Sequence, residues 1–451
     1  MEEGKHTVDL NGEFRFKIDA KGRMSLPAKF RKLLSDELVV TRSLQDECIY
    51  VFDDGQFEQW VNQLFVDSFG GYRSNNAKHV GLRRKLKSRA RDVQVDWSDN
   101  AVSRTRMELG SEEALTDSKP YQLRRYLDYA ESEGSVCVLH LIADDPEVYA
   151  GLDGAKISRV NAANRKFMAP WREYTMNDRV QWSIAALPAE PWAKKMFPEL
   201  DTAAAIEAQW KLIFDTCRVT GGDPVGEWQK HLDRLNELGA KMNALDLESV
   251  HFESANGTDL TVGLAEQAVW ESAGSKNEKG VPFLPNIPTE EVFTAPHKDK
   301  VDGIVYGTKP YVFNGQLIKN FHVTFKDGKV VEHGADEGAD LLGQLLDTDE
   351  GARHIGEVAL VPASSPINRS GKLFYNTLFD ENAACHIAFG DSYPGTTVGG
   401  TGLSKEELAA RGMNHSSLHE DVMIGAEDSE ITGKCRDGRT VQLFQNGVWV
   451  L

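Results

Sequence analysis

The chain has 451 residues, which exceeds one ordinary domain and predicts two or three. Hydrophobic residues make up 41% and charged residues 27%, values that exclude an intrinsically disordered chain. The formal charge of -18 is uneven, because residues 1–95 carry 17 Lys and Arg against 14 Asp and Glu, whereas the rest carries 34 against 55. We therefore expect residues 96–451, the body, to repel nucleic acid, and residues 1–95, the head, to tolerate it.

The N-terminal sequence Met-Glu-Glu-Gly-Lys-His is charged where a signal peptide needs an apolar core, and no run reaches the roughly 18 apolar residues of a membrane span. We expect a cytoplasmic protein without membrane association. The five cysteines lie far apart without a Cys-x-x-Cys pair, which argues against a disulfide framework or a thiolate zinc site. They are Cys48, Cys137, Cys217, Cys385 and Cys435.

The head is predicted to be strands followed by helices. Residues 14–18 alternate with the period of a strand, and residues 19–23 form a turn. Further strands are predicted over residues 38–41 and 48–52. Helical periodicity follows over residues 57–65 and 80–90.

An α/β pattern begins near residue 93. Residues 136–142 are apolar and short, as in a buried strand, and the amphipathic residues 155–176 are the helix expected to cover it. Asp223 and Pro224 suit the cap and the first position of a helix that runs on to Leu245.

Beyond residue 250 the chain is strand-rich and has few helices. Strands are predicted over residues 249–253, 258–262 and 321–325, the last followed by a turn over residues 326–329. Polar side chains of the kinds that bind metals concentrate in this part. The sequence therefore predicts that the chemistry lies here.

A pair of hard divalent cations needs about five or six oxygen and imidazole ligands, with one carboxylate placed to bridge. Candidate groups lie in residues 286–291, 356–357, 381–386 and 419–421. His419 and Asp421 alternate, so on a strand both would face one ion. Spacing alone leaves metal binding open, because a single glutamate is usually a solvated charge.

Four ordered motifs, residues 286–294, 306–310, 381–390 and 415–425, resemble the aminopeptidase T/aminopeptidase S family of metallopeptidases. The similarity extends from about residue 93 to the end. It implies two divalent metal ions, with zinc expected and cobalt, magnesium or manganese as alternatives, peptide substrates with a free N-terminus, and a homodimer. The metal ligands that it implies are Glu291, Glu357, Glu381, His386, His419 and Asp421.

In such a site the metals lower the pKa of a water, which attacks the first peptide carbonyl. The resemblance places Tyr393 beside the metals, where its hydroxyl could bond the oxyanion, although a buried structural ring is the other interpretation. Glu290 is a candidate general base. Strand alternation, however, would turn Glu290 away from its neighbour Glu291. Cys385 is expected to be a small buried residue rather than a ligand.

The head resembles the transcriptional regulator MraZ, through residues 18–31, 39–42, 48–52 and 82–91. The resemblance implies a swapped-hairpin, AbrB-like head of strands and helices. Within it Asp19 and Arg23 would pair structurally, and Arg15 and Lys17 are the better phosphate contacts.

MraZ contains two Asp-x-x-Gly-Arg motifs, whereas this chain has one and continues into the aminopeptidase pattern at residues 93–96. The sequence leaves open whether the joint is a natural gene fusion or a recombined or misassembled reading frame. Because half of the regulator fold is missing, DNA binding by residues 1–95 is doubtful.

We therefore predict an α/β and α+β multidomain protein with a MraZ-like head (1–95), a truncated α/β domain of the aminopeptidase (96–248) and a strand-rich dinuclear-metal catalytic domain (249–451). The leading function is a metal-dependent aminopeptidase. The alternatives are a DNA-binding regulator with an inactive peptidase body and a nonfunctional chimera. The complete ligand set favours the enzyme.

Overall fold

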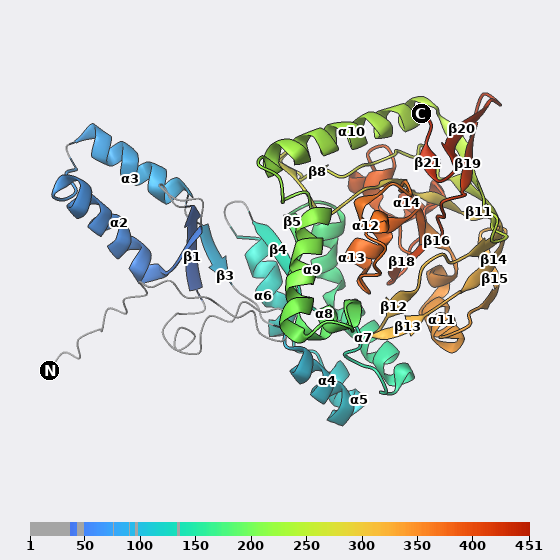
Figure 1. Cartoon of the computed structure of the whole chain (residues 1–451), viewed down its shortest axis with the longest axis horizontal. Coiled ribbons are helices and arrows are strands. Elements are labelled where there is room, and N and C mark those ends of the chain that lie inside the picture. The colour runs from blue at the N-terminus through green and yellow to red at the C-terminus, as the bar shows by residue number, and fades with distance from the viewer. Residues whose placement is uncertain (1–36, 43–48, 75, 90, 95–97, 133–135) are drawn as a thin grey trace. The chain divides into compact units, whose positions relative to one another are not determined.

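The computed structural model describes residues 37–42, 49–74, 76–89, 91–94, 98–132 and 136–451 (Figure 1). The chain divides into two compact units, one ending at Asp99 and one running from Asn100 to Leu451. Among the described residues, no helix has the length and apolar character needed to cross a membrane.

The first unit is a small sheet with two helices. Strand β1 (Glu37–Arg42) pairs antiparallel with both β2 (Ile49–Asp53) and β3 (Arg91–Gln94), and α2 (Asp54–Phe69) and α3 (Ala77–Arg89) complete it. The predicted strands at 38–41 and 48–52 and both predicted helices are present. The predicted hairpin over residues 14–23, with Arg15, Lys17, Asp19 and Arg23, lies outside the described residues.

The core of this unit is apolar and aromatic. Val39 of β1 packs against Phe57, Val61 and Phe65 on one face of α2, and Leu86 of α3 joins them. The spacing of the three α2 residues is the helical period that predicted this element.

The second unit begins with a helix-rich part. Its helices are α4 (Asn100–Leu109), α5 (Glu112–Thr116), α6 (Pro120–Ala130), α7 (Gly154–Met176), α8 (Glu190–Met196), α9 (Thr202–Thr216) and α10 (Pro224–Ala244). Strands β4 (Cys137–Ile142) and β5 (Gln181–Ala186) pair in parallel. The side chain of Asp223 accepts a hydrogen bond from the Gly226 amide at 3.0 Å, which confirms the predicted cap of α10.

The predicted burial of the strand at 136–142 is wrong. Leu139 and Leu141 of β4 are 59% and 53% exposed. The helix at 155–176 is confirmed as α7, but its Ile157 and Val160 pack with Met107 of α4, which is not the cover predicted for the strand. The physical reason is that β4 pairs only with β5 in the described part of the chain, so little of its surface is covered.

The C-terminal part holds two sheets. The larger has the strand order β15-β14-β11-β7-β6-β19-β20-β21 and is antiparallel. Its strands are β6 (Leu247–Glu253), β7 (Asp259–Leu264), β11 (Pro296–Tyr306), β14 (His322–Lys326), β15 (Lys329–Gly334), β19 (Glu430–Cys435), β20 (Thr440–Gln445) and β21 (Val448–Trp449). The predicted turn over residues 326–329 joins β14 to β15, and Asp327 and Gly328 adopt the positive φ that a tight hairpin requires.

The smaller sheet, which holds most of the candidate ligands, has the order β10-β16-β17-β18, all antiparallel. Its strands are β10 (Val292–Thr294), β16 (Ile355–Leu360), β17 (His386–Gly390) and β18 (His419–Met423). Every residue of β16 and β17 is buried. A charged side chain on these strands is therefore held where water cannot solvate it.

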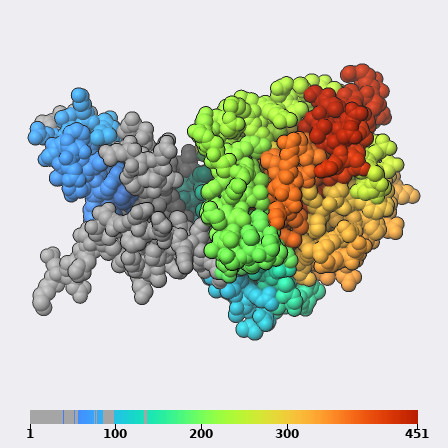
Figure 2. Space-filling model, in the orientation of Figure 1, coloured from blue at the N-terminus to red at the C-terminus, as the bar shows by residue number. Residues whose placement is uncertain are grey.

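Short elements connect these parts. They are β8 (Ser275–Lys276), β9 (Pro282–Phe283), β12 (Tyr311–Phe313), β13 (Gln316–Ile318), α11 (Ala339–Leu346), α12 (Pro366–Arg369), α13 (Thr377–Asp380), α14 (Lys405–Ala410), and the 3-10 helices η1 (Glu350–Arg353), η2 (Glu381–Ala383), η3 (Pro394–Thr396) and η4 (Gly400–Gly402). On the face seen in Figure 2, residues of α9 and α10 (green) lie beside the orange segment that contains α12 and the red C-terminal strands.

Candidate metal centre

The register of the smaller sheet brings distant residues to one face. Glu357 lies opposite Ala388, and Ala388 lies opposite Asp421. Opposed residues on neighbouring strands point to the same side, so the two carboxylates flank a small alanine. His386 and His419 precede Ala388 and Asp421 by two residues and share their faces. Four of the six predicted ligands therefore converge through strand pairing.

The carboxylate of Glu357 faces both imidazoles. Its Oε1 lies 3.5 Å from His386 Nε2, and its Oε2 lies 3.7 Å from His419 Nε2. Asp421 Oδ1 lies 3.6 Å from His419 Nε2 and 3.9 Å from His386 Nε2. These residues form a compact polar cluster in the buried sheet.

The other two predicted ligands come from beside the sheet. Glu291 directly precedes β10, and its Oε2 lies 3.3 Å from His386 Nε2. Glu381 begins η2, and its Oε1 accepts a hydrogen bond from Asn382 at 3.2 Å. Burial raises the pKa of Asp421, but the charge and hydrogen bond of His419 outweigh burial, and a hydrogen bond with Glu381 adds to the lowering, which places the Glu381 carboxylate beside Asp421.

Two groups of these side chains offer ligand atoms that lie within 4.8 Å of one another. They are Glu291, Glu357 and His386, and Glu357, His419 and Asp421. Glu357 belongs to both. Glu381 belongs to neither, although it adjoins the second group.

Charge in the cluster is unbalanced without cations. Burial raises the pKa of Glu357, and burial together with the carboxylates of Asp421 and Glu291 raises the pKa of Glu381 well above its usual value. Burial opposes protonation of His419, but Asp421 and Glu357 outweigh it and raise its pKa to about 10. Four buried carboxylates thus demand positive charge, which divalent ions supply.

The imidazoles are oriented for coordination. His386 Nδ1 lies 3.2 Å from the carbonyl oxygen of Ala384, and His419 Nδ1 lies 2.8 Å from that of Asp391. Since a carbonyl only accepts, each Nδ1 carries the proton and each Nε2 is left for a metal. Asp421 Oδ1 is buried without a hydrogen-bond partner, which also fits an ion at this place. The residues present therefore suit a divalent metal site.

Tyr393 lies against the cluster. Its ring meets that of His419 edge to face, with centroids 4.8 Å apart. Burial and the carboxylates of Glu357 and Asp421 raise the pKa of Tyr393 well above its usual value, so the phenol stays protonated. Within the described part of the chain its hydroxyl has no hydrogen-bond partner, which leaves a donor free.

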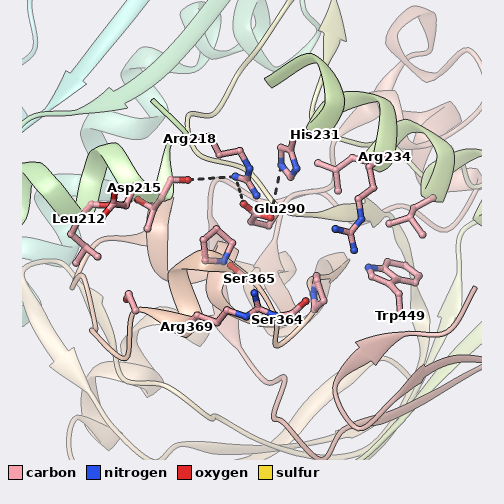
Figure 3. Close-up of a pocket in the computed structure, with 16 residues that line it drawn as sticks. Leu212, Asp215, Arg218, His231, Arg234, Glu290, Ser364, Ser365, Arg369 and Trp449 are labelled. Carbon is pink, nitrogen blue, oxygen red and sulfur yellow. Dashed lines mark hydrogen bonds and ion pairs between the residues drawn. The ribbon is translucent and has the colours of Figure 1, made fainter. Parts of the chain in front are cut away.

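Glu290 is turned away from the cluster. Its Oε1 lies 2.5 Å from Arg218 Nη1, and its Oε2 lies 3.8 Å from His231 Nε2. These groups line a separate cavity of about 500 Å³ (Figure 3).

Cys385, beside His386, is buried as predicted, and its thiol donates to the carbonyl oxygen of Val361 at 3.2 Å.

Asn382 is a site residue that the sequence did not single out. It is fully buried, its Nδ2 donates to Glu381, and its Oδ1 accepts from the Glu290 amide at 2.7 Å. It therefore ties two predicted site segments together. The sequence feature that could have identified Asn382 is its position inside the motif of residues 381–390. Arg218 and His231 had no such signal, because they lie outside every motif.

Comparison with known proteins gives two matches along the chain. Residues 77–449 match the model of the peptidase family M29, described as thermophilic metalloprotease. Residues 10–71 match the model of the MraZ protein family. The two matches therefore meet between residues 71 and 77, upstream of the joint at 93–96 that the motifs indicated.

The body is similar over most of its length to aminopeptidases. Aminopeptidase 2 of Geobacillus stearothermophilus is 41% identical over 360 residues, 80% of this chain and 86% of the relative. Aminopeptidase T of Thermus aquaticus is 40% identical over 357 residues, 79% of this chain and 86% of the relative. The solved structure of wild-type AmpT from Thermus thermophilus superposes with a TM-score of 0.73 at 33% identity, covering 88% of this chain and 100% of that chain.

The head is similar to part of a regulator. The transcriptional regulator MraZ of Saccharopolyspora erythraea is 50% identical over 48 residues, which cover 11% of this chain and 33% of the relative.

Proposed function

Because the chain belongs to the M29 family of metallopeptidases, we propose that it removes N-terminal residues from peptides at a centre of two divalent metal ions. One ion would be held by Glu291, His386 and Glu357, and the other by Glu357, His419 and Asp421. Glu381, beside Asp421, would complete the second set. Ligands of nitrogen and oxygen without cysteine are compatible with zinc, with cobalt, magnesium or manganese as alternatives.

The observation that carries the proposal is the position of Glu357. Its two oxygens face different imidazoles, at 3.5 Å and 3.7 Å, and it is common to both groups of ligand atoms. A carboxylate that bridges two ions has this arrangement. If only one ion were bound, by Glu291, His386 and Glu357, the imidazole of His419 and the carboxylate of Asp421 would have no cation to coordinate.

Bound divalent ions would supply Lewis-acid chemistry, lowering the pKa of a water and polarising the peptide carbonyl. The protein's own groups act around that centre. The protonated hydroxyl of Tyr393 donates to the oxygen on which negative charge develops. The free α-amine of an unblocked peptide, once deprotonated, would be able to bind a metal ion, which favours a free N-terminus. Glu290 is the proposed proton acceptor, and it must leave Arg218 to act.

The test is hydrolysis by the purified full chain. We expect unblocked di- and tripeptides to be cleaved from the N-terminus, N-acetylated versions to resist, and a chelator to abolish activity. Efficient cleavage of the blocked peptides, or activity that survives complete metal removal, would contradict the proposal. The homodimer implied by the family resemblance stays a prediction, which sedimentation velocity measures.

A further inference from the structure

A second cavity adjoins the metal centre, and of its lining residues only the Glu290 and Arg218 pair takes part in the proposed chemistry. It measures about 500 Å³ and is lined from α9, α10, the segment around α12, and β21 (Figure 3). Three arginines line it, namely Arg218, Arg234 and Arg369, each from a different segment of the chain. The cavity therefore gathers three cationic side chains in a chain whose formal charge is -18.

The positive charge of the cavity is only partly balanced. Glu290 pairs with Arg218 at 2.5 Å. Within the described residues, neither Arg234 nor Arg369 has a carboxylate within ion-pair distance. The other lining carboxylate, Asp215, is exposed, as Arg234 and Arg369 are, and in the described part of the chain it forms no ion pair with either of them. Two guanidinium groups are therefore left to face the cavity without an anion.

The cavity wall also carries an unused donor. The Nε1 of Trp449 is buried and has no hydrogen-bond partner. Figure 3 shows the Trp449 indole beside the Arg234 guanidinium, with Arg369 on the same side of the cavity as Ser364. An indole nitrogen only donates, as guanidinium groups do, so Arg234, Arg369 and Trp449 present donors alone to the cavity.

We propose that this cavity binds an oxyanion, a carboxylate or a phosphate, through Arg234, Arg369 and the indole N–H of Trp449. Guanidinium groups bind both anions through paired, charge-assisted hydrogen bonds. The ion pair of Arg218 and Glu290 forms the inner wall of the cavity and carries no net charge. Binding of the anion satisfies the buried indole donor, which otherwise costs free energy.

The inner wall is shared with the metal centre. The Glu290 amide donates to Asn382 Oδ1 at 2.7 Å, and Asn382 Nδ2 donates to Glu381 Oε1 at 3.2 Å. The oxyanion has two possible sources, a free phosphate or the C-terminal carboxylate of a short peptide. The second source rests on the proposed aminopeptidase function, whereas the first does not.

The binding test uses inorganic phosphate and thermal unfolding of the full chain at constant ionic strength. We expect phosphate to raise the Tm of the native protein, because an anion that binds only the folded state stabilises it. Arg234→Gln with Arg369→Gln should abolish the rise, and Trp449→Phe, which keeps a ring but loses the donor, should reduce it. Arg124→Gln removes an exposed arginine of α6 and is the matched control. No rise in the native protein, or an equal rise in all variants, would overturn the proposal.

The source is distinguished with a tripeptide that has either a free or an amidated C-terminus. If the peptide supplies the carboxylate, kcat/KM favours the free acid, and the double arginine variant lowers that preference by about tenfold or more. If the preference is absent while the phosphate effect depends on the arginines, the anion site takes free phosphate. If no peptide is cleaved, the proposed function fails while the phosphate measurement still decides this inference.

Discussion

Glu290 and Glu291 are neighbours in sequence, and their carboxylates serve different sites. Glu290 Oε1 lies 2.5 Å from Arg218 Nη1, whereas Glu291 Oε2 lies 3.3 Å from His386 Nε2. Successive side chains in extended backbone point in opposite directions. Glu290 therefore faces the cavity lined by Arg218, whereas Glu291 faces the predicted metal centre.

Substitution of each glutamate separates the two roles. We expect Glu291→Gln to lose bound metal and activity, because an amide is a poorer ligand than a carboxylate. Glu290→Gln should keep its metal and lower kcat by about a hundredfold or more, as for loss of a general base. Metal content by mass spectrometry and kcat are measured together. A near-normal kcat for Glu290→Gln would leave this residue as the partner of Arg218 alone.

Glu357→Gln should have the largest effect on the metal centre. Since both groups of ligand atoms contain Glu357, its loss weakens both predicted ions, and we expect less than one bound ion per chain and no measurable hydrolysis. Glu332→Gln, an exposed change on β15, is the matched control and should retain full metal and activity. Two ions retained in the Glu357 variant would exclude a bridging role.

Tyr393→Phe should lower kcat while leaving metal content and stability unchanged. The hydroxyl has no hydrogen-bond partner among the described residues, so its loss removes little from the folded protein. Loss of one oxyanion donor lowers kcat by about 10²- to 10³-fold in other hydrolases. Steady-state kinetics and thermal unfolding check this. A lower Tm with normal kcat would assign the ring a structural role.

Asp349 should confer a pH-dependent stability. It accepts hydrogen bonds from Ser416 Oγ at 2.7 Å, Ser417 N at 2.8 Å and Ala352 N at 3.0 Å. Burial raises the pKa of Asp349, but the hydrogen bonds from Ser416 and Ser417 outweigh burial and lower the pKa below its usual value. The stabilisation is therefore present above the unfolded pKa and is lost as pH falls through the lower folded pKa.

The variant Asp349→Asn tests this sign. We expect it to be less stable than the native protein by about 1–3 kcal/mol at pH 7, with the difference shrinking below pH 4. Urea unfolding at several pH values measures it, with the exposed Asp340→Asn in α11 as control. A difference that stays constant down to pH 3 would contradict the assignment.

The head should bind DNA weakly. Residues 1–95 carry a small positive excess, and Arg83 of α3 is already engaged by Glu58 Oε2 at 3.0 Å and Asn62 Oδ1 at 2.9 Å. Specific recognition needs repeated phosphate contacts in register. We expect binding of the full chain at low salt to vanish at physiological salt. Tight binding that survives the higher salt would favour the regulator hypothesis.

Local patterns in the sequence were sufficient for features that depend only on neighbouring residues. The cap of α10 by Asp223, the alternation of His419 and Asp421, and the opposite directions of Glu290 and Glu291 all follow from backbone geometry over a few residues. The six candidate ligands came from a family resemblance, because spacing could not distinguish them from solvated charges.

Contacts between residues that are distant in the sequence were determined only by the tertiary structure. The row Glu357, Ala388 and Asp421 depends on the register of three strands, and the exposure of Leu139 depends on which neighbours β4 lacks. Arg234, Arg369 and Trp449 share a cavity although no motif connects them. Side-chain direction along one strand is a local property of the backbone, whereas register, coverage and charge balance arise from pairings between segments distant in the chain.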